Sequence, residues 1–245
     1  MTRPRVYILD WLRGIAVCGM VLHHALFAYE QVAYIFGASA EGWIFDFLGT
    51  RTFWVLQEIF VGLFLLISGI CTAYSRSVLR RGLIVSGAAL AITLVTGVLL
   101  PAVGVSGLEI WFGILHMFGL SMLLYGLFTC KKRWVPVVTG VALFCFWLAV
   151  INCPGTEWAE NAKVIVGILP QGFYSADYYP LIPYFFLYLA GTFIGPAVRD
   201  GKMPGWFYTA RFKPLEWVGR NSLWIYIAHQ PILFGVFALI FYLLN

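Results

Sequence analysis

The chain has 245 residues, of which 61% are hydrophobic and only 11% are charged, and its mean hydropathy is +0.86. This composition excludes an ordinary water-soluble domain and predicts an integral membrane protein. The formal net charge of +5 does not indicate nucleic-acid binding, because a basic excess is expected in the cytoplasmic loops of a multi-pass protein.

About seven stretches of some twenty mostly apolar residues are long enough to cross a bilayer as helices. They cover approximately residues 6–29, 52–74, 82–101, 109–129, 134–152, 178–197 and 217–243. Backbone groups in lipid must be hydrogen-bonded internally, so we expect an all-α, polytopic transmembrane helical bundle. Since no internal repeat and no separate soluble stretch interrupts it, residues 1–245 are predicted to form a single domain.

Basic residues in the connecting segments predict the orientation of the bundle. With the N-terminus inside, the cytoplasmic segments carry Arg3, Arg5, Arg76, Arg80, Arg81, Lys131, Lys132, Arg133, Arg199, Lys202, Arg211 and Lys213. The outer segments 30–51 and 153–177 are mildly acidic and carry only Arg51 and Lys163. This asymmetry predicts an N-in, C-out topology in the cytoplasmic membrane. Within the second outer segment, the apolar run 164–170 is too short to span and is expected to be an interfacial or re-entrant piece.

The first predicted helix carries ionisable residues at membrane depth. Residues 6–28 (VYILDWLRGIAVCGMVLHHALFA) resemble a signal peptide, but Asp10 and Arg13 interrupt the apolar run and no cleavage site follows, so we expect a retained helix. Asp10 and Arg13 are one turn apart, and His24 follows Arg13 after close to three turns. Arg13 and His24 therefore share one polar stripe, about 16 Å apart along the axis. Ionisable groups at this depth indicate a functional site.

Four residues of the outer half of the bundle are the candidate catalytic residues. Glu58 and His116 fall about two turns below the outer face of their helices, in the same layer as His23 and His24. A carboxylate beside an imidazole is a common arrangement of a general base and its orienting group. His24 is favoured over His23, which points about 100° away from the stripe. The alternative is that Glu58 and His116 are buried polar residues that hold helices together.

The last predicted helix carries a second polar face. The sequence WVGRNSLWIYIAHQPILFG at 217–235 sets Asn221, Tyr226 and His229 at helical spacing. This face either lines the same cavity as the first helix or supplies interhelical hydrogen bonds, and the sequence favours neither. Asn221, Tyr226 or His116 would be able to donate hydrogen bonds to a tetrahedral oxyanion.

On the inner side, Arg13 and Arg220 are candidate phosphate ligands, because guanidinium forks match phosphate oxygens. Alternatively, Arg13 only pairs with Asp10, and Arg220 anchors at the lipid headgroups. The five cysteines show no paired spacing and are interpreted as packing residues, so no metal site is predicted. No P-loop, GxGxxG, HExxH or GxSxG motif is present either.

Four blocks of this sequence resemble bacterial members of the heparan-alpha-glucosaminide N-acetyltransferase-like family. They are LDWLRGIAVCGMVLHH at 9–24, IWFGILHMFGLSMLL at 110–124, ADYYPLIPYFFLYLAGTFIG at 176–195 and LEWVGRNSLWIYIAHQPILF at 215–234. The first and last blocks are also similar to those of the polysaccharide O-acyltransferases of bacterial membranes, whose first helix has an arginine-to-histidine spacing like that of Arg13 and His24.

The resemblance implies transfer of an acetyl or other acyl group from cytosolic acetyl-CoA to an amino sugar or glycan on the extracytoplasmic side. It implies that His24 is the general base or a transient acyl carrier. Donor binding would then fall to Asp10, Arg13, Arg220, Asn221, Tyr226 and His229. The chain has fewer helices than full-length members, and a homodimer would supply the remainder. The competing hypotheses are a small-molecule or lipid transporter and a non-catalytic membrane scaffold.

Overall fold

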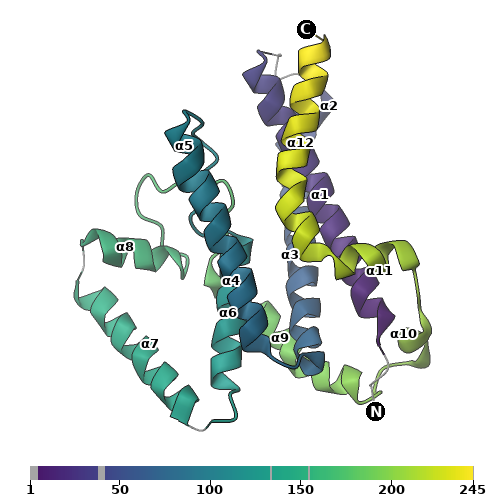
Figure 1. Cartoon of the computed structure of the whole chain (residues 1–245), viewed down its shortest axis with the longest axis vertical. Helices are drawn as coiled ribbons and strands as arrows, with labels where there is room; N and C mark the ends of the chain where they lie inside the picture. Colours follow the sequence, from purple (N-terminus) through teal and green to yellow (C-terminus); the bar gives the residue numbers. More distant parts are fainter. Residues whose placement is uncertain (1–4, 38–41, 133, 154, 245) are drawn as a thin grey trace. The chain divides into compact units, whose positions relative to one another are not determined.

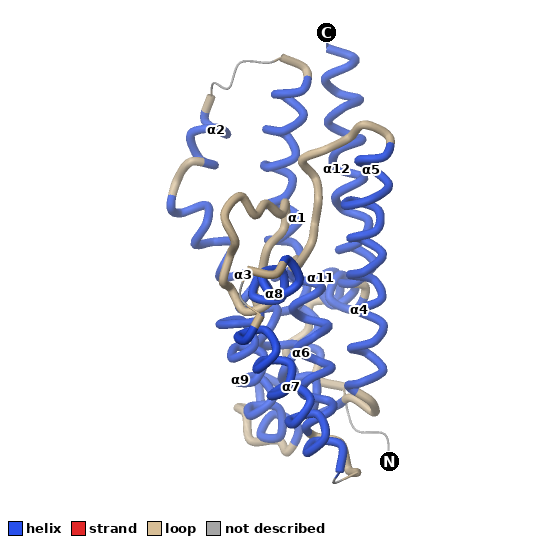
Figure 2. Tube along the Cα trace, turned by 90° about the vertical axis from the view of Figure 1, so that its left-hand side faces the viewer, coloured by secondary structure: helices blue, strands red, loops and turns tan. Residues whose placement is uncertain are grey.

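The computed structural model of the chain describes residues 5–37, 42–132, 134–153 and 155–244. Helices make up 77% of it, and these ranges contain no strand, only an isolated bridge between Phe112 and Tyr178. Figure 2 shows helices joined by loops throughout. The all-α prediction is confirmed. Arg3 and Arg133, which contributed to the orientation argument, lie outside the described residues.

Within the described ranges, six helices are long and apolar enough to cross a membrane. They are α1 (Tyr7–Ile35), α3 with η1 (Arg51–Ile70 and Cys71–Tyr74), α4 with η2 and α5 (Val78–Leu94, Val95–Leu99 and Leu100–Ala102), α7 (Trp134–Asn152), α9 (Leu181–Arg199) and α12 (Ser222–Leu244). The predicted span 109–129 is the shorter apolar helix α6 (Ile114–Phe128). The prediction of a multi-pass membrane bundle is therefore confirmed, and its N-in, C-out orientation stays a prediction.

Four shorter helices complete the described chain: α2 (Trp43–Leu48), α8 (Glu157–Val164), α10 (Gly205–Thr209) and α11 (Lys213–Arg220). Side-chain caps mark where two of the long helices begin. The Thr50 hydroxyl accepts from the Phe53 N–H at 3.3 Å, and the Ser77 hydroxyl accepts from the Arg80 N–H at 3.2 Å. Such caps satisfy backbone donors that have no partner within the helix.

Three predicted segments are compared with the structure in detail. Helix α1 continues past the expected end at residue 29, as far as Ile35. In the second outer segment, the apolar run 164–170 begins with the last residue of α8 and continues as turn and loop, and its interfacial or re-entrant position stays a prediction. The predicted span 217–243 is two helices, α11 and α12, which separate at Asn221. The single-helix prediction was wrong there, because hydropathy along a sequence does not record a change of helix direction.

The chain divides into two compact units, Met1–Cys71 with Ile194–Asn245 and Thr72–Phe193. In the first unit, α1 contacts α3, α11 and α12. Figure 1 shows α12 running beside the C-terminal part of α1, while α11 crosses its N-terminal part. In the second unit, α4 packs against α6, which also contacts α7. The assignment of residues 1–245 to a single domain stays a prediction.

Two glycines let α11 cross α1 at backbone contact. A Cβ atom at Gly14 would collide with the carbonyl oxygen of Leu215, and one at Gly219 would collide with the carbonyl oxygen of Asp10. Small residues at helix crossings permit such close approach. Arg13 precedes Gly14 and Arg220 follows Gly219, so the helix crossing also fixes the backbone positions of these two arginines.

The second unit uses the same device between α4 and α6. A Cβ atom at Gly119 would lie 2.5 Å from the Ser86 hydroxyl oxygen, and one at Gly126 would lie 2.8 Å from the Leu79 side chain. The first turn of α6 is held from another segment, since Asp177 Oδ2 accepts the Ile114 N–H at 3.0 Å. Glycine contacts therefore position the main helix pair of each unit.

Candidate functional site

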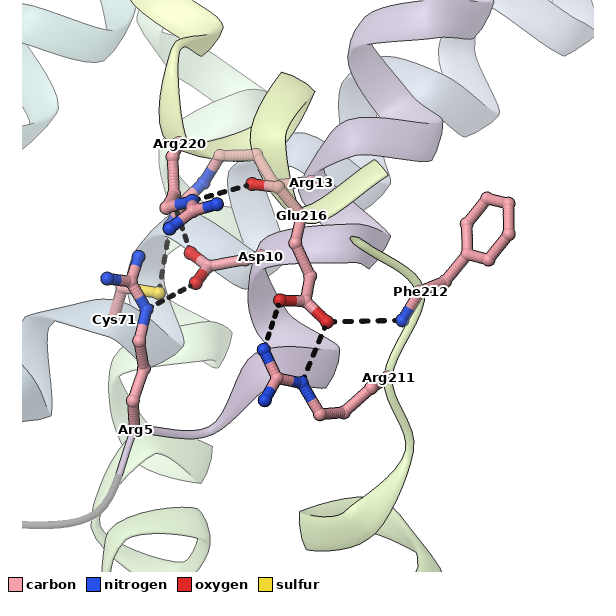
Figure 3. A network of polar contacts seen from close by, with 8 residues as sticks. All are labelled: Arg5, Asp10, Arg13, Cys71, Arg211, Phe212, Glu216 and Arg220. Atoms are coloured by element: carbon pink, nitrogen blue, oxygen red, sulfur yellow. Dashed lines mark hydrogen bonds and ion pairs between the residues drawn. The ribbon is translucent and has the colours of Figure 1, made fainter. Parts of the chain in front are cut away.

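Four arginines and two carboxylates form a cluster where α11 crosses the start of α1 (Figure 3). Its members are Arg5, Asp10, Arg13, Arg211, Glu216 and Arg220. The two carboxylates are buried, with Asp10 7% exposed and Glu216 2% exposed. Buried charges require partners, and both have them. With every group ionised, the cluster carries two positive charges in excess.

Asp10 joins the N-terminal segment to α1. Its Oδ2 accepts from Nε of Arg5 at 2.7 Å, and its Oδ1 lies 3.7 Å from Nη1 of Arg13. Donation of this hydrogen bond to Asp10 raises the pKa of the Arg5 guanidinium. Arg13 also donates from Nη2 to Sγ of Cys71 at 2.9 Å, at the end of α3. Arg13 therefore pairs with Asp10, as one sequence interpretation expected, but that ion pair uses only part of its guanidinium.

Glu216 holds the segment before α11. It accepts from Nη2 of Arg211 at 3.0 Å, from Nε of Arg211 at 3.2 Å and from the Phe212 N–H at 3.1 Å. The hydrogen bonds from Arg211 lower the pKa of the Glu216 carboxyl. The Arg211 guanidinium also lies 3.4 Å from the ring centre of Tyr7, at the start of α1. These contacts bind Arg211 to the Glu216 carboxylate through two of its nitrogens.

Arg220 ends α11 with an exposed side chain. Its Nε donates to the carbonyl oxygen of Glu216 at 3.2 Å, within the network drawn in Figure 3. Asn221 follows at the junction, where its Nδ2 donates to the carbonyl oxygen of Trp217 at 2.9 Å. Arg13 and Arg220 are thus the two arginines of the cluster without a close carboxylate hydrogen bond, which makes them the groups best suited to an added anion.

Farther along α1, on the C-terminal side of the arginine cluster, a pair of histidines joins α1 to α12. Nδ1 of His24 lies 2.8 Å from Nε2 of His229, and the ring centroids are 4.9 Å apart. His229 is 6% exposed, and its Nδ1 lies 2.6 Å from the carbonyl oxygen of Tyr226. The polar face predicted on the last helix therefore meets the polar stripe of the first helix at this pair.

The other two candidates of the first unit take no part in the hydrogen bond between His24 and His229. His23 stacks on Phe53 of α3, with ring centroids 4.0 Å apart and an interplanar angle of 13°. Its Nε2 is buried and has no hydrogen-bond partner among the described residues. Glu58 is exposed on α3. The predicted divergence of His23 from the stripe is seen, and the catalytic roles of His23 and Glu58 stay predictions.

His116 belongs to the second unit and caps its own helix. Its Nδ1 accepts the Gly113 N–H at 3.2 Å, and its Nε2 lies 2.9 Å from the Thr93 hydroxyl oxygen. The Thr93 hydroxyl donates to the Ile110 carbonyl at 2.8 Å, so Nε2 of His116 carries the proton and donates to Thr93. Both ring nitrogens are thereby used in local structure. This geometry favours the packing interpretation of His116 over the catalytic one.

The catalytic family model of heparan-alpha-glucosaminide N-acetyltransferase matches residues 5–231. The chain belongs to the heparan-alpha-glucosaminide N-acetyltransferase family. No curated protein and no solved structure matches it significantly. Family membership confirms the resemblance seen in the four sequence blocks, and together with the apolar helices it indicates in general terms a transmembrane acetyltransferase. A bacterial origin stays a prediction.

The matched range of this N-acetyltransferase family includes every candidate residue, from Asp10 to His229. Sequence reasoning missed Glu216, Arg211 and Cys71, all of which hold the arginine cluster together. The sequence did contain a signal for the ion pair of Glu216, because Glu216 in LEWVGR closely follows the basic ARFK segment. Among the residues that the structure describes, no group of three or more His, Cys, Asp or Glu side chains is arranged to hold a metal ion.

Proposed function

We propose that this family member transfers an acetyl group from cytosolic acetyl-CoA to an amino sugar or glycan on the extracytoplasmic side of the membrane. One observation carries the proposal. A single helix, α1, has an arginine cluster at its N-terminal end and, about 16 Å farther along its axis, a histidine hydrogen-bonded to α12. A donor site and a base would thus be held on one rigid element.

Arg13 and Arg220 are the proposed ligands of the donor phosphates. Coenzyme A carries a diphosphate and a ribose phosphate, and the cluster has two positive charges in excess. Guanidinium groups bind such oxygens through charge-assisted hydrogen bonds. Asp10, buried beside Arg13, would fix the direction of that side chain. The pantetheine arm would then carry the thioester away from the cluster toward His24.

His24 is the proposed general base. Its imidazole would take the proton from the acceptor amine or hydroxyl, whose nitrogen or oxygen attacks the thioester carbonyl carbon. The carbon–sulfur bond then breaks, and the leaving thiolate takes the proton back from the imidazole as free coenzyme A. Transient acylation of His24 would divide the same transfer into two steps. Tyr226, one turn before His229, is the proposed oxyanion donor, because the Asn221 amide already caps α11.

The orientation belongs to the same proposal. Acetyl-CoA is cytosolic, so the arginine cluster has to face the cytosol, which an N-in topology in the cytoplasmic membrane provides. The acceptor would then reach His24 from the outer half of the bilayer. The proposal includes a homodimer, whose second subunit would supply helices of the substrate path that one subunit lacks.

The test uses the purified full chain in nanodiscs with radiolabelled acetyl-CoA and a panel of amino sugars. We expect acceptor-dependent release of coenzyme A, which His24→Ala lowers by a factor of about 10² to 10⁴, the usual contribution of a general base. Trp224→Phe is the control, because Trp224 is on α12 and 71% exposed. A wild-type protein that neither binds acetyl-CoA nor releases coenzyme A would reject the proposal in favour of a transporter or scaffold.

A further inference from the structure

We infer that His229 is a positioning residue that holds His24 in the tautomer protonated at Nδ1, so that Nε2 of His24 is the reactive atom and the two rings form a proton relay. The inference rests on the proposed role of His24 as the base. It removes His229 from the donor path on which the sequence prediction put it.

The first step concerns the proton on His229. Its Nδ1 lies 2.6 Å from the carbonyl oxygen of Tyr226, one turn earlier on α12. A carbonyl oxygen only accepts hydrogen bonds. Nδ1 of His229 is therefore the protonated nitrogen, and in a neutral ring Nε2 carries the lone pair.

The second step transfers this constraint to α1. Nε2 of His229 faces Nδ1 of His24 at 2.8 Å, and a lone pair on one side requires a proton on the other. His24 is then protonated at Nδ1, which leaves its Nε2 with the lone pair that a general base or nucleophile needs. The tautomers of both rings follow from one backbone carbonyl.

The third step concerns what holds the pair rigid. His229 is 6% exposed, and its two nitrogens bind two different helices, since Tyr226 is on α12 and His24 is on α1. The His23 ring flanks His24 on α1, with centroids 5.5 Å apart at an angle of 81°. An imidazole whose orientation is fixed by a second group is the recurring arrangement of catalytic bases.

The relay accounts for one proton. When Nε2 of His24 takes the proton from the acceptor, the Nδ1 proton of His24 can move to Nε2 of His229. His24 is then neutral and protonated at Nε2, whereas His229 is an imidazolium whose two N–H groups face the Tyr226 carbonyl and Nδ1 of His24. Reversal of both transfers returns the proton to the leaving thiolate. No bond other than N–H bonds changes within the pair.

A direct test reads the tautomers without any substrate. The chain has four histidines, so ¹⁵N-histidine labelling and NMR in nanodiscs give few signals, and His24→Gln and His229→Gln assign two of them. We expect His24 and His229 protonated at Nδ1, with His116 protonated at Nε2 as the internal reference. A neutral His24 protonated at Nε2 would overturn the inference, whatever the activity of the protein.

The functional test compares two replacements at one position. His229→Gln keeps an acceptor near the place of Nε2, whereas His229→Phe removes it. We expect kcat to fall about 100-fold in His229→Phe and about tenfold or less in His229→Gln, with the KM for acetyl-CoA within about twofold of wild type. In a His24→Ala background, neither replacement should lower the residual rate further, because His229 acts through His24.

The outcomes separate this inference from the proposed function. A raised KM with unchanged kcat in His229→Phe would return His229 to donor binding and overturn the relay. Equal loss of kcat in both replacements would overturn the positioning role, since a glutamine that keeps the hydrogen-bond acceptor should restore part of kcat. If NMR showed the expected tautomers but the protein did not transfer acetyl groups, the proposed function would be rejected and the tautomer assignment would remain valid.

Discussion

Two imidazoles on apolar helices have opposite surroundings in the two units of this protein. His116 in the second unit uses both ring nitrogens for the first turn of α6, through the Gly113 N–H and the Thr93 hydroxyl. His24 in the first unit is bonded through Nδ1 to another imidazole, His229. The predicted depth of the two histidines in the membrane is similar, whereas their hydrogen-bond partners differ.

The largest expected effect tests this contrast directly. We expect His24→Ala to lower kcat/KM for acetyl transfer by about 10³-fold, because the proposed general base is lost. His116→Ala should change kcat/KM per folded molecule by less than about threefold, while it destabilises the protein by about 1 kcal/mol through loss of the cap. Steady-state rates and thermal melts of both variants measure this. His116→Asn, which retains a cap acceptor, is the matched control, and an equal loss of activity at both histidines would break the comparison.

Arg13 extends the comparison to the inner end of α1. Arg13→Gln removes a charged donor that only partly pairs with Asp10, and a charge-assisted hydrogen bond contributes about 1.5–3 kcal/mol. We therefore expect the KM for acetyl-CoA to rise at least about tenfold with a smaller change in kcat. Lys213→Gln is the control, since Lys213 is an exposed cation of α11. Unchanged binding of acetyl-CoA in Arg13→Gln would show that Arg13 serves structure alone.

Gly219 tests whether the helix crossing sets the site in the first unit. A Cβ atom there would collide with the Asp10 carbonyl, and overpacking of this kind costs about 1–3 kcal/mol. We expect Gly219→Ala to lower the melting temperature and to weaken acetyl-CoA binding together. Gly235→Ala is the control, because a Cβ atom at Gly235 meets nothing within 4 Å. If the two variants melted alike, backbone contact between α1 and α11 would not be what holds the cluster.

The smallest expected effect is the pH dependence of the structural ion pair in the cluster. The pKa of Glu216 lies below its ordinary value of 4.5 because Arg211 donates hydrogen bonds to it. The unfolded chain then takes up the proton first, so this contribution to stability is fully present above about pH 4.5 and is lost as the pH falls through the lower folded pKa. Melting curves of Glu216→Gln should depend less on pH in this acidic range than those of wild type. Parallel curves would contradict the assignment.

Part of this picture follows from the sequence because it depends on contiguous residues. Hydropathy over about twenty residues predicts a spanning helix, and six of the seven predicted spans contain a helix long and apolar enough to cross a membrane, whereas the seventh is the shorter helix α6. Helical periodicity likewise sets Asp10, Arg13 and His24 on one stripe of α1. Family blocks in fixed order predicted the family, which the match over residues 5–231 confirms.

The tertiary structure decided which polar residues meet. His24 and His229 are 205 positions apart in the sequence, and their contact depends on how α12 is rotated against α1, which no local pattern encodes. The same holds for the break at Asn221, which turns α11 across α1, and for the Thr93 contact that makes His116 a cap. Sequence determined the helices and their polar stripes, because these are properties of one segment. Packing decided which residues are partners, because a hydrogen bond between two segments requires their side chains to face each other at the same height.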